Sequence, residues 1–257
     1  MGITKLAIKF AAPFPKVQSF DRYLFVGPHP DDIEIGAGAT VAALAAQGKS
    51  ICFLICTDGR YGTDNLKEPV SEEELIAIRK DEAIRSAAAL GVTDVRFLEL
   101  SDGGFYDTDE LVRLIAGVIS DFQPDVIFAP DPSPSSECHI DHLNVGIAVR
   151  TLATNASNPG IMKKLGAAPC PLKAIAFYMT AKPNVFMKTT GFVKKQLDAI
   201  FENHLSQYPK GCLARNTIGL YLKLRAKDFG FRSFHLTAEG FRILGTTHMH
   251  CLPEAGL

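Results

Sequence analysis

Three features are missing from this chain of 257 residues: a long apolar run, an excess of charge of either sign, and closely paired cysteines. No stretch approaches the ~18 consecutive apolar residues of a transmembrane helix, so we expect no membrane span. The 27 Lys and Arg balance 28 Asp and Glu. This balance argues against nucleic acid as a partner, because a general nucleic-acid binder carries a basic surface. Tryptophan is also absent, which excludes nothing.

The cysteine pattern excludes a zinc ribbon, because none of the six cysteines forms a CxxC pair. Such widely spaced cysteines are typical of reduced, mostly buried thiols, so we predict a cytoplasmic protein. The segment 1–16 has one Lys ahead of a short, broken apolar run. Because it lacks a long apolar region followed by a small-residue cleavage site, we expect no signal peptide. The cysteines are Cys52, Cys56, Cys138, Cys170, Cys212 and Cys251.

Strand-like and helix-like segments alternate over the first 155 residues or so. Nearly continuous apolar strands are expected at 23–27, 50–57, 95–100 and 125–130, and helices at 35–46, 71–90, 109–122 and from about 139. Ser71 and Glu74 form a capping box, and Gly91 is a helix stop. Apolar strands of this kind are typical of a parallel sheet covered on both faces. We predict an α/β, Rossmann-like fold, with a mostly parallel twisted sheet and helices on both faces.

After residue 155 the alternation lapses into a link containing Pro, Gly and Asn, which ends near residue 172. A strand is expected at 173–180 and a helix at 192–207, followed by a mixed tail. We predict one domain over 1–257, with a core at about 20–155 and a C-terminal extension at about 170–257.

Polar residues concentrate where the four predicted strands end. The segments are "GPHPDD", "TDGRYGTDN", "SDGGFYD" and "DPSPSSECHIDH". In a doubly wound sheet, ligands bind beyond the carboxyl ends of the strands. The four segments therefore predict one site at this edge of the sheet.

The first and last of these segments contain a possible zinc-ligand set. His29 and Asp32 lie three residues apart in one turn, and His142 begins a helix at another strand end. Two imidazoles and a carboxylate are a catalytic zinc set, with a fourth position left for water. Zinc would lower the pKa of that water to about 7.

Three further residues have candidate catalytic roles. Asp31, next to a predicted ligand, suits a general base acting on the water. His139 lies near the reacting centre, and Asp141 can orient an imidazole by accepting its N–H.

Other interpretations of these residues remain open. "HPDD" and "HxDH" are each common as polar turns or helix starts. "GAGAT" at 36–40 resembles part of a dinucleotide-binding turn, which would suggest a nucleotide-dependent oxidoreductase or methyltransferase, but the third glycine is missing. Arg79 could contact a polar substrate group or be a solvated helix charge. His204, His248 and His250 are individually more typical of core or surface histidines than of ligands.

The motifs together resemble those of the LmbE/PIG-L family of zinc-dependent N-acetylglucosamine de-N-acetylases. The matching segments, in the family's order, span roughly 24–207 and are "PHPDDIEIGAGAT", "TDGRYGT", "RKDEAIRSAAALGV", "LELSDG", "PDVIFAPDPS", "HIDHLNVG" and "LDAIFENHLSQ". The resemblance implies a Rossmann-like fold and removal of an acetyl group from an N-acetylglucosamine-type sugar.

The resemblance also implies a role for each matching residue. The metal ligands are His29, Asp32 and His142, and the general base is Asp31. His139 would stabilise the oxyanion or help to protonate the leaving amine, with Asp141 orienting it. Arg79 falls in an R-x-x-E motif associated with substrate binding, which Glu82 completes.

The chain departs from the family pattern at three positions. Pro28 replaces an alanine, Ile33 stands where an acidic residue often follows, and Ile140 replaces a proline. None is a predicted ligand, so the departures bear on the substrate pocket. In some disaccharide deacetylases of the family a neighbouring subunit contributes a C-terminal histidine, a role open here to His248 or His250.

The predicted function is therefore a zinc-dependent hydrolase with one Zn²⁺ per chain, although another divalent metal would also fit. Its partner is a small N-acetyl sugar, and the predicted oligomeric state is left open. Two alternatives share the fold: an amidase acting on a thiol–sugar conjugate, and a non-catalytic zinc- or sugar-binding protein.

Overall fold

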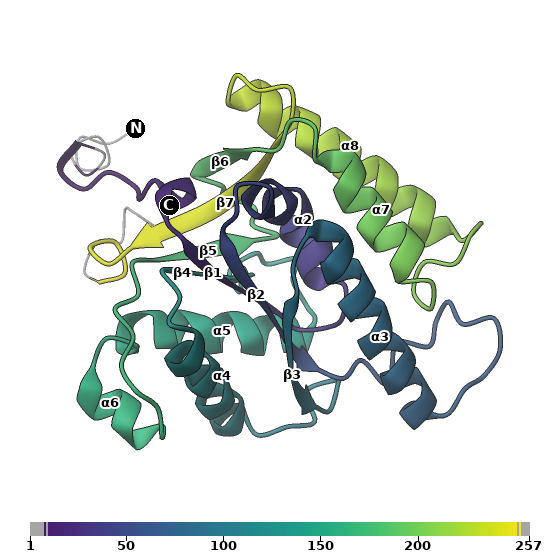
Figure 1. Cartoon of the computed structure of the whole chain (residues 1–257), viewed down its shortest axis with the longest axis horizontal. Helices are drawn as coiled ribbons and strands as arrows, with labels where there is room; N and C mark the ends of the chain where they lie inside the picture. The colour runs from purple at the N-terminus through teal and green to yellow at the C-terminus, as the bar shows by residue number, and fades with distance from the viewer. Residues whose placement is uncertain (1–7, 9, 251, 253–257) are drawn as a thin grey trace.

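A seven-stranded sheet forms the centre of the computed structural model, which describes residues 8, 10–250 and 252 (Figure 1). The strand order is β3-β2-β1-β4-β5-β7-β6. Five strands pair in parallel, and β7 and β6 join antiparallel at one side. The predicted mostly parallel, Rossmann-like sheet is thus confirmed. The strands are β1 Arg22–Gly27, β2 Ser50–Thr57, β3 Asp94–Leu100, β4 Val126–Pro130, β5 Ala174–Tyr178, β6 Val185–Lys188 and β7 Ala238–Gly245.

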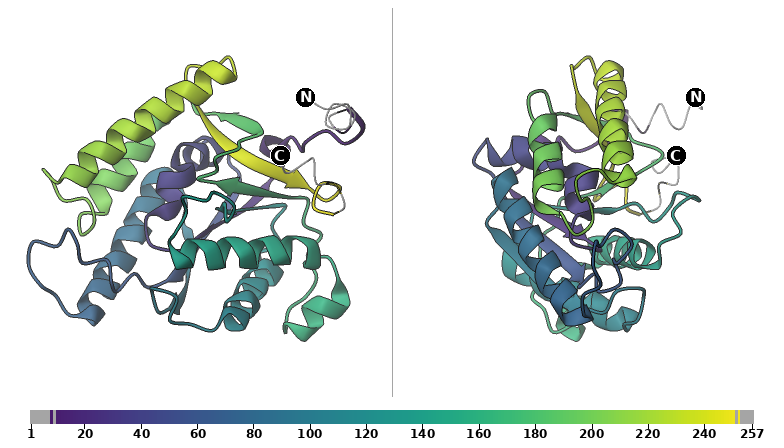
Figure 2. Two further views of the ribbon diagram at one scale, coloured as in Figure 1. Left: turned by 180° about the vertical axis from the view of Figure 1, so that it is seen from behind. Right: turned by 90° about the vertical axis from the view of Figure 1, so that its right-hand side faces the viewer.

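Helices cover both faces of the sheet (Figures 1 and 2). One face carries α4 Thr108–Phe122, α5 Ile140–Asn155 and the short α6 Pro159–Lys164. The other carries α2 Asp32–Ala45, α3 Glu72–Leu90 and α7 Val193–Asn203, with α8 Leu213–Arg232 packed against α7 and β7. A 3₁₀ turn, η1 Val17–Ser19, precedes β1.

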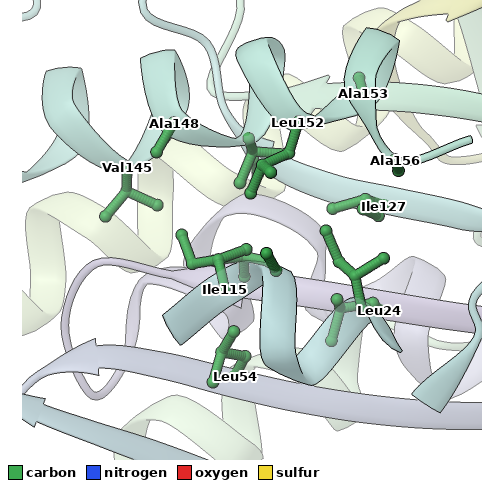
Figure 3. Close-up of a cluster of buried hydrophobic side chains, with 14 of the residues drawn as sticks. Leu24, Leu54, Ile115, Ile127, Val145, Ala148, Leu152, Ala153 and Ala156 are labelled. Carbon is green, nitrogen blue, oxygen red and sulfur yellow. The ribbon is translucent and has the colours of Figure 1, made fainter. Parts of the chain in front are cut away.

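Successive strand residues divide between the two cores, because side chains of a strand point alternately to opposite faces. Leu24 and Val26 of β1 pack with α4 and α5, whereas Tyr23 and Phe25 pack with α2. Figure 3 shows the first core, where Leu24, Leu54 and Ile127 of three strands meet Ile115 of α4 and Val145 and Leu152 of α5. Both faces being buried explains why these strands are apolar almost throughout.

Most element boundaries follow the predicted ones. The capping box of Ser71 and Glu74 is present, and Gly91 ends α3 at φ +99°. Two boundaries were wrong: α2 begins at Asp32, not at residue 35, and α7 ends at Asn203, not at residue 207. The carboxylate of Asp32 accepts the His29 N–H at 2.9 Å, which draws the turn tight against the helix start.

The C-terminal half holds more regular structure than predicted. The link after residue 155 contains α6, which begins with an Asn158 cap and Pro159 at its first position. The tail predicted as mixed contains α8 and β7, and β7 lies between β5 and β6. The helix was missed because much of its apolar surface faces solvent, so its residues show no one-sided pattern.

The predicted burial of the cysteines is confirmed for three of the five that the structure describes. Cys52, Cys56 and Cys170 are buried as expected, whereas Cys138 is exposed and Cys212 is half-buried. Cys251 and positions 1–7 and 9, which make up half of the segment assessed for a signal peptide, lie outside the described residues. Among the described residues, no helix has the length and apolarity needed to cross a membrane.

Candidate metal centre and catalytic site

The predicted site residues gather at the carboxyl edge of the sheet, between β1 and β4. The chain continues from β1 to β2 on one side, and β4 lies on the other side of β1. This is a topological switch point, where the loops beyond two adjacent strands separate and leave a crevice. His29, Asp31 and Asp32 follow β1, and His139 and His142 come from the β4–α5 connection.

His29 is the hub of the cluster and is only 7% exposed. Its Nδ1 lies 3.1 Å from Asp32 Oδ2. Its Nε2 lies 3.0 Å from Asp102 Oδ1 and 3.1 Å from Asp141 Oδ2. Both ring nitrogens therefore face buried carboxylates.

Asp32 joins the first segment to the last. Its Oδ2, which is 3.1 Å from His29 Nδ1, is also 3.3 Å from His142 Nε2. The other ring nitrogen of His142, Nδ1, lies 3.0 Å from Glu137 Oε2. A carboxylate behind a histidine in this way fixes the orientation of its ring.

The donor atoms fit a divalent metal ion. Nitrogens of His29, His139 and His142 lie within 4.8 Å of one another, and a second group joins His29 and His139 with Asp102 and Asp141. Imidazole nitrogens and carboxylate oxygens are the ligands of catalytic zinc and of related divalent metals. The cluster can thus hold a metal.

Asp141 is held by the turn after β3. Its Oδ2 accepts the Gly103 N–H at 2.8 Å and its Oδ1 accepts the Gly104 N–H at 2.9 Å. Burial raises the pKa of the Asp141 carboxyl, but hydrogen bonds from His29, Tyr106 and Gly103 outweigh it and hold that pKa well below its usual range. This anion is nearer to His29 Nε2, at 3.1 Å, than to His139 Nδ1, at 3.6 Å.

Asp31 sits beside the cluster in a strained, buried turn. Its φ is +136°, in a region that residues with a Cβ rarely adopt. Its Oδ2 accepts a hydrogen bond from the Tyr208 hydroxyl at 3.1 Å, and its Oδ1 lies 3.6 Å from Arg79. Burial raises the pKa of the Asp31 carboxyl, against the opposing charge of Arg79.

Arg79 is buried under two loops of the site. Its guanidinium donates to the Gly59 carbonyl at 2.9 Å and to the Pro30 carbonyl at 3.0 Å. A Cβ at Gly59 or Gly62 would come within 2.4 or 2.5 Å of the Arg79 side chain, so glycine is required for this approach. The guanidinium therefore ties the turn that carries Asp31 to the loop after β2.

The charges of the three histidines differ without a metal. Burial lowers the pKa of His29, but hydrogen bonds to Asp102, Asp141 and Asp32 reverse this and raise it well above its usual value. For His142, burial is outweighed by Asp32, and the pKa rises to about 9. Burial and its two cationic neighbours lower the pKa of His139, which stays neutral.

Several residues of the site were not singled out from the sequence. Asp102 belongs to "SDGG" and Glu137 to "SSECHIDH", both of which were recognised as polar strand ends. Tyr208 lies 177 residues from Asp31 along the chain, and nothing in its local sequence indicates that contact.

The other motif residues have internal partners. Glu82 accepts hydrogen bonds from the Ser206 N–H at 2.8 Å and hydroxyl at 2.6 Å, and so holds the segment after α7. His204 is fully buried, with its Nε2 3.2 Å from Glu34. His248 is also buried, and its ring contacts the Gly245 N–H and the Ala12 carbonyl of the same chain.

Fold and site together define an α/β protein with a candidate metal centre at the switch point of its sheet. Comparison with known families then assigns the chain more narrowly. The chain belongs to the PIG-L family, whose model, described as GlcNAc-PI de-N-acetylase, matches residues 24–153. The resemblance read from the motifs is thereby confirmed.

Individual relatives span most of the chain. It is 32% identical to the diacetylchitobiose deacetylase of Thermococcus kodakarensis, over 98% of this chain and 93% of the relative. A solved structure of N,N'-diacetylchitobiose deacetylase from Pyrococcus horikoshii superposes with a TM-score of 0.84 at 29% identity, covering 98% of this chain and 97% of the other.

A third relative matches this chain over only part of the length of each protein. The 1D-myo-inositol 2-acetamido-2-deoxy-alpha-D-glucopyranoside deacetylase of Thermomonospora curvata is 34% identical over 60% of this chain and 62% of the relative. Each of these relatives is named as a deacetylase.

Proposed function

We propose that this protein is a zinc-dependent hydrolase that removes the acetyl group from an N-acetylglucosamine-type sugar. The observation that carries the proposal is the group of imidazoles and mostly buried carboxylates at the switch point. It occurs in a chain similar over nearly its full length to a diacetylchitobiose deacetylase. The relatives' substrates suggest an N-acetylated disaccharide or a related conjugate for this chain.

In the proposed site, His29, Asp32 and His142 hold the metal. The position of Asp32 Oδ2, 3.1 Å from one imidazole and 3.3 Å from the other, supports this ligand set. When bound, zinc polarises the acetamide carbonyl and lowers the pKa of a coordinated water to about 7.

The proton transfers are assigned to Asp31 and His139. Asp31 takes the proton of the attacking water, a role favoured by its buried position and its raised pKa. His139, whose side chain is 48% exposed, can reach a bound substrate from the open side. It stabilises the oxyanion and helps to deliver a proton to the departing amine.

Asp141 and Arg79 complete the proposed site. Asp141 orients imidazoles: its anion lies within 3.1 Å of His29 and 3.6 Å of His139. Arg79 remains a proposed substrate-binding residue, and its contacts with Asp31 and the Pro30 carbonyl support an effect on substrate through the turn that carries the base.

The direct test is acetate release from N,N'-diacetylchitobiose and from inositol-linked N-acetylglucosamine. We expect release that stops after treatment with a chelator and returns with Zn²⁺. Equal release before and after complete metal removal would contradict a metal-dependent mechanism. No release from any N-acetylglucosamine conjugate by the zinc-loaded protein would contradict the substrate class.

A further inference from the structure

Two exposed aromatic rings from different loops lie against each other beside the metal centre. Tyr61, in the connection after β2, is 47% exposed, and Phe105, in the connection after β3, is 73% exposed. Their ring centroids are 6.1 Å apart, and the ring planes are inclined at 82°. Single exposed apolar residues need no explanation, whereas these two rings come from separate loops and meet. We call Tyr61 and Phe105 the aromatic pair.

The turn that carries Phe105 is attached directly to the metal centre. Asp102 Oδ1, in this turn, lies 3.0 Å from His29 Nε2. The N–H groups of the two glycines that follow donate to the carboxylate of Asp141 at 2.8 and 2.9 Å. Phe105 therefore comes one residue after a turn whose backbone is fixed by the proposed site.

The loop that carries Tyr61 is anchored on both sides of the ring. The Gly59 carbonyl accepts a hydrogen bond from Arg79 at 2.9 Å. The Gly62 carbonyl accepts one from the side-chain amide of Gln207 at 2.8 Å. Because the loop is already held in place, a ligand that contacts the Tyr61 ring loses little free energy in ordering it.

Apolar surface continues from the aromatic pair to the mouth of the site. A Cβ at Gly103 would lie 3.2 Å from one ring of the pair and 3.6 Å from the other, and a Cβ at Gly104 would lie 3.0 Å from Ile140. Ile140 is 45% exposed. It follows His139 in the sequence, whose side chain is 48% exposed. The pair and Ile140 thus border the open side of the metal centre.

The chemistry of the aromatic pair fits the apolar face of a sugar ring. The face of an aromatic ring carries partial negative charge, and a pyranose presents a face of C–H groups with partial positive charge. The two rings are nearly perpendicular and do not cover each other, so both keep surface for a ligand. A pyranose can contact them with its C–H face and leave its hydroxyl groups to polar groups of the site and to water.

The size of the aromatic pair favours a small ligand over a protein partner. An aromatic side chain buries roughly 150–250 Å² when fully covered. Two such rings supply only about half of the ~800 Å² that each partner contributes to a stable protein–protein complex. The area is suited to one sugar unit.

We propose that the aromatic pair binds the sugar unit next to the N-acetylglucosamine unit that is deacetylated. This inference rests on the proposed function, in which the reacting acetamide lies at the metal. His29 is only 7% exposed, whereas the two rings are 47% and 73% exposed. The pair therefore lies at the rim, where a unit linked to the reacting sugar leaves the buried centre. It selects saccharides of two or more units over a single N-acetylglucosamine.

The test compares kcat/KM for acetate release from N,N'-diacetylchitobiose and from N-acetylglucosamine. We expect Phe105→Ala and Tyr61→Ala each to reduce the preference for the disaccharide about tenfold, through a higher KM, as loss of one aromatic contact does. Phe105→Tyr keeps a ring and should keep the preference. Phe105→Leu keeps only apolar bulk and should behave as Phe105→Ala. The wild-type preference in Phe105→Ala or in Phe105→Leu would overturn the inference.

The matched control is Ile84→Ala on α3, a side chain 46% exposed and so exposed to the same degree as Tyr61. It should leave the preference for the disaccharide unchanged. An equal loss of preference in Ile84→Ala would show that the effect is not specific to the pair and would overturn the inference.

A binding measurement separates this inference from the proposed function. Calorimetry gives the dissociation constant of N,N'-diacetylchitobiose for zinc-loaded Asp31→Asn, and adding Phe105→Ala should raise that constant about tenfold. If zinc-loaded wild type releases no acetate from any conjugate, the proposed function fails, while binding that depends on the ring would still support a saccharide site. No binding of the disaccharide, or binding that both ring variants leave unchanged, would overturn the inference.

Discussion

Two adjacent carboxyl groups of this site, Asp31 and Asp32, lie in opposite electrostatic surroundings. Burial raises the pKa of both carboxyl groups. For Asp32 it is outweighed by His142 and His29, which hold the pKa well below its usual range. For Asp31, burial outweighs the opposing charges of Arg79, His204 and His29, and its pKa is raised. Groups whose surroundings separate their pKa values in this way are typical of a division between ligand and base.

Replacing the proposed base should separate turnover from metal binding. We predict that Asp31→Asn retains zinc but loses about 10²–10⁴-fold in kcat, the usual contribution of general base catalysis. Bound zinc is measured by elemental analysis and turnover by acetate release. His29→Ala is the comparison, because it should lose metal and activity together. Undiminished turnover by Asp31→Asn would refute the assignment of Asp31 as base.

Glu137 should matter through His142. Its carboxylate lies 3.0 Å from His142 Nδ1, so Glu137→Gln weakens the support of a proposed ligand. We expect zinc affinity to fall about 10–100-fold, as measured by competition with a chromogenic chelator. Glu73→Gln, an exposed change on α3, is the control and should leave the affinity unchanged. An unchanged affinity in Glu137→Gln would count against this role.

Zinc binding should strengthen as pH rises. His142 in the metal-free protein has its pKa raised to about 9, so at neutral pH the metal must displace its proton. Each proton displaced changes the apparent affinity by about tenfold per pH unit. We therefore expect binding to tighten from neutral pH up to about 9, as His142 loses its proton. Titration calorimetry in buffers of different ionisation enthalpy should show proton release. An affinity independent of pH would contradict the protonated state of His142.

At the scale of elements, the turn after β3 determines where Asp141 lies. Gly103 and Gly104 have φ of +79° and +78°, and their N–H groups bind the Asp141 carboxylate. Both glycines are needed because the turn adopts the left-handed region twice in succession. This short loop thus anchors the start of α5, the helix that carries His142.

Two Gly→Ala changes should have opposite effects on stability. Gly104→Ala puts a Cβ 3.0 Å from Ile140 at a positive φ, and we expect a loss of about 1–3 kcal/mol in the free energy of unfolding. Gly117→Ala lies within α4 and meets nothing within 4 Å. It should add roughly 0.5–1 kcal/mol, because alanine is the better helix former. Denaturant unfolding measures both. A Gly104→Ala protein as stable as wild type would show that the turn tolerates a side chain.

At the scale of the whole molecule, the site depends on the strand order. β1 lies between β2 and β4, so the crevice opens between two strands that are far apart in the chain. The cluster of Asp32, Asp102 and Asp141 around His29 concentrates negative charge there. A bound divalent cation would neutralise part of that charge. It would also link the turn after β1 to the start of α5.

Metal removal should therefore lower the stability of the entire fold. Zinc at about 100 times its dissociation constant stabilises a protein by ~2.7 kcal/mol when it binds only the folded state. We expect a lower melting temperature after chelation and its recovery on addition of zinc, as followed by calorimetry. His29→Ala should show no such recovery. Equal melting temperatures with and without metal would contradict a metal centre in the core.

The local elements and much of the site could be predicted because their signals lie close together in the chain. The buried strands are continuous apolar runs, the start of α3 is a four-residue capping box, and "HPDD" and "HIDH" each place their candidates within one turn. Helix α8 and the contact of Tyr208 with Asp31 could not be predicted in the same way. In α8, exposed apolar residues obscure the hydrophobic pattern of the helix. In the Tyr208–Asp31 contact, 177 residues separate the two partners along the chain.

The sequence by itself determined the alternation of strands and helices, the strand ends that carry the polar residues, and the family. These depend on local patterning and on motifs with set spacing. Only the tertiary structure decided that Asp141 lies nearer to His29 than to His139, that Arg79 is buried beneath the turn of Asp31, and that α8 presents an apolar face. Such facts depend on how distant segments pack, because burial and charge act through space and not along the chain.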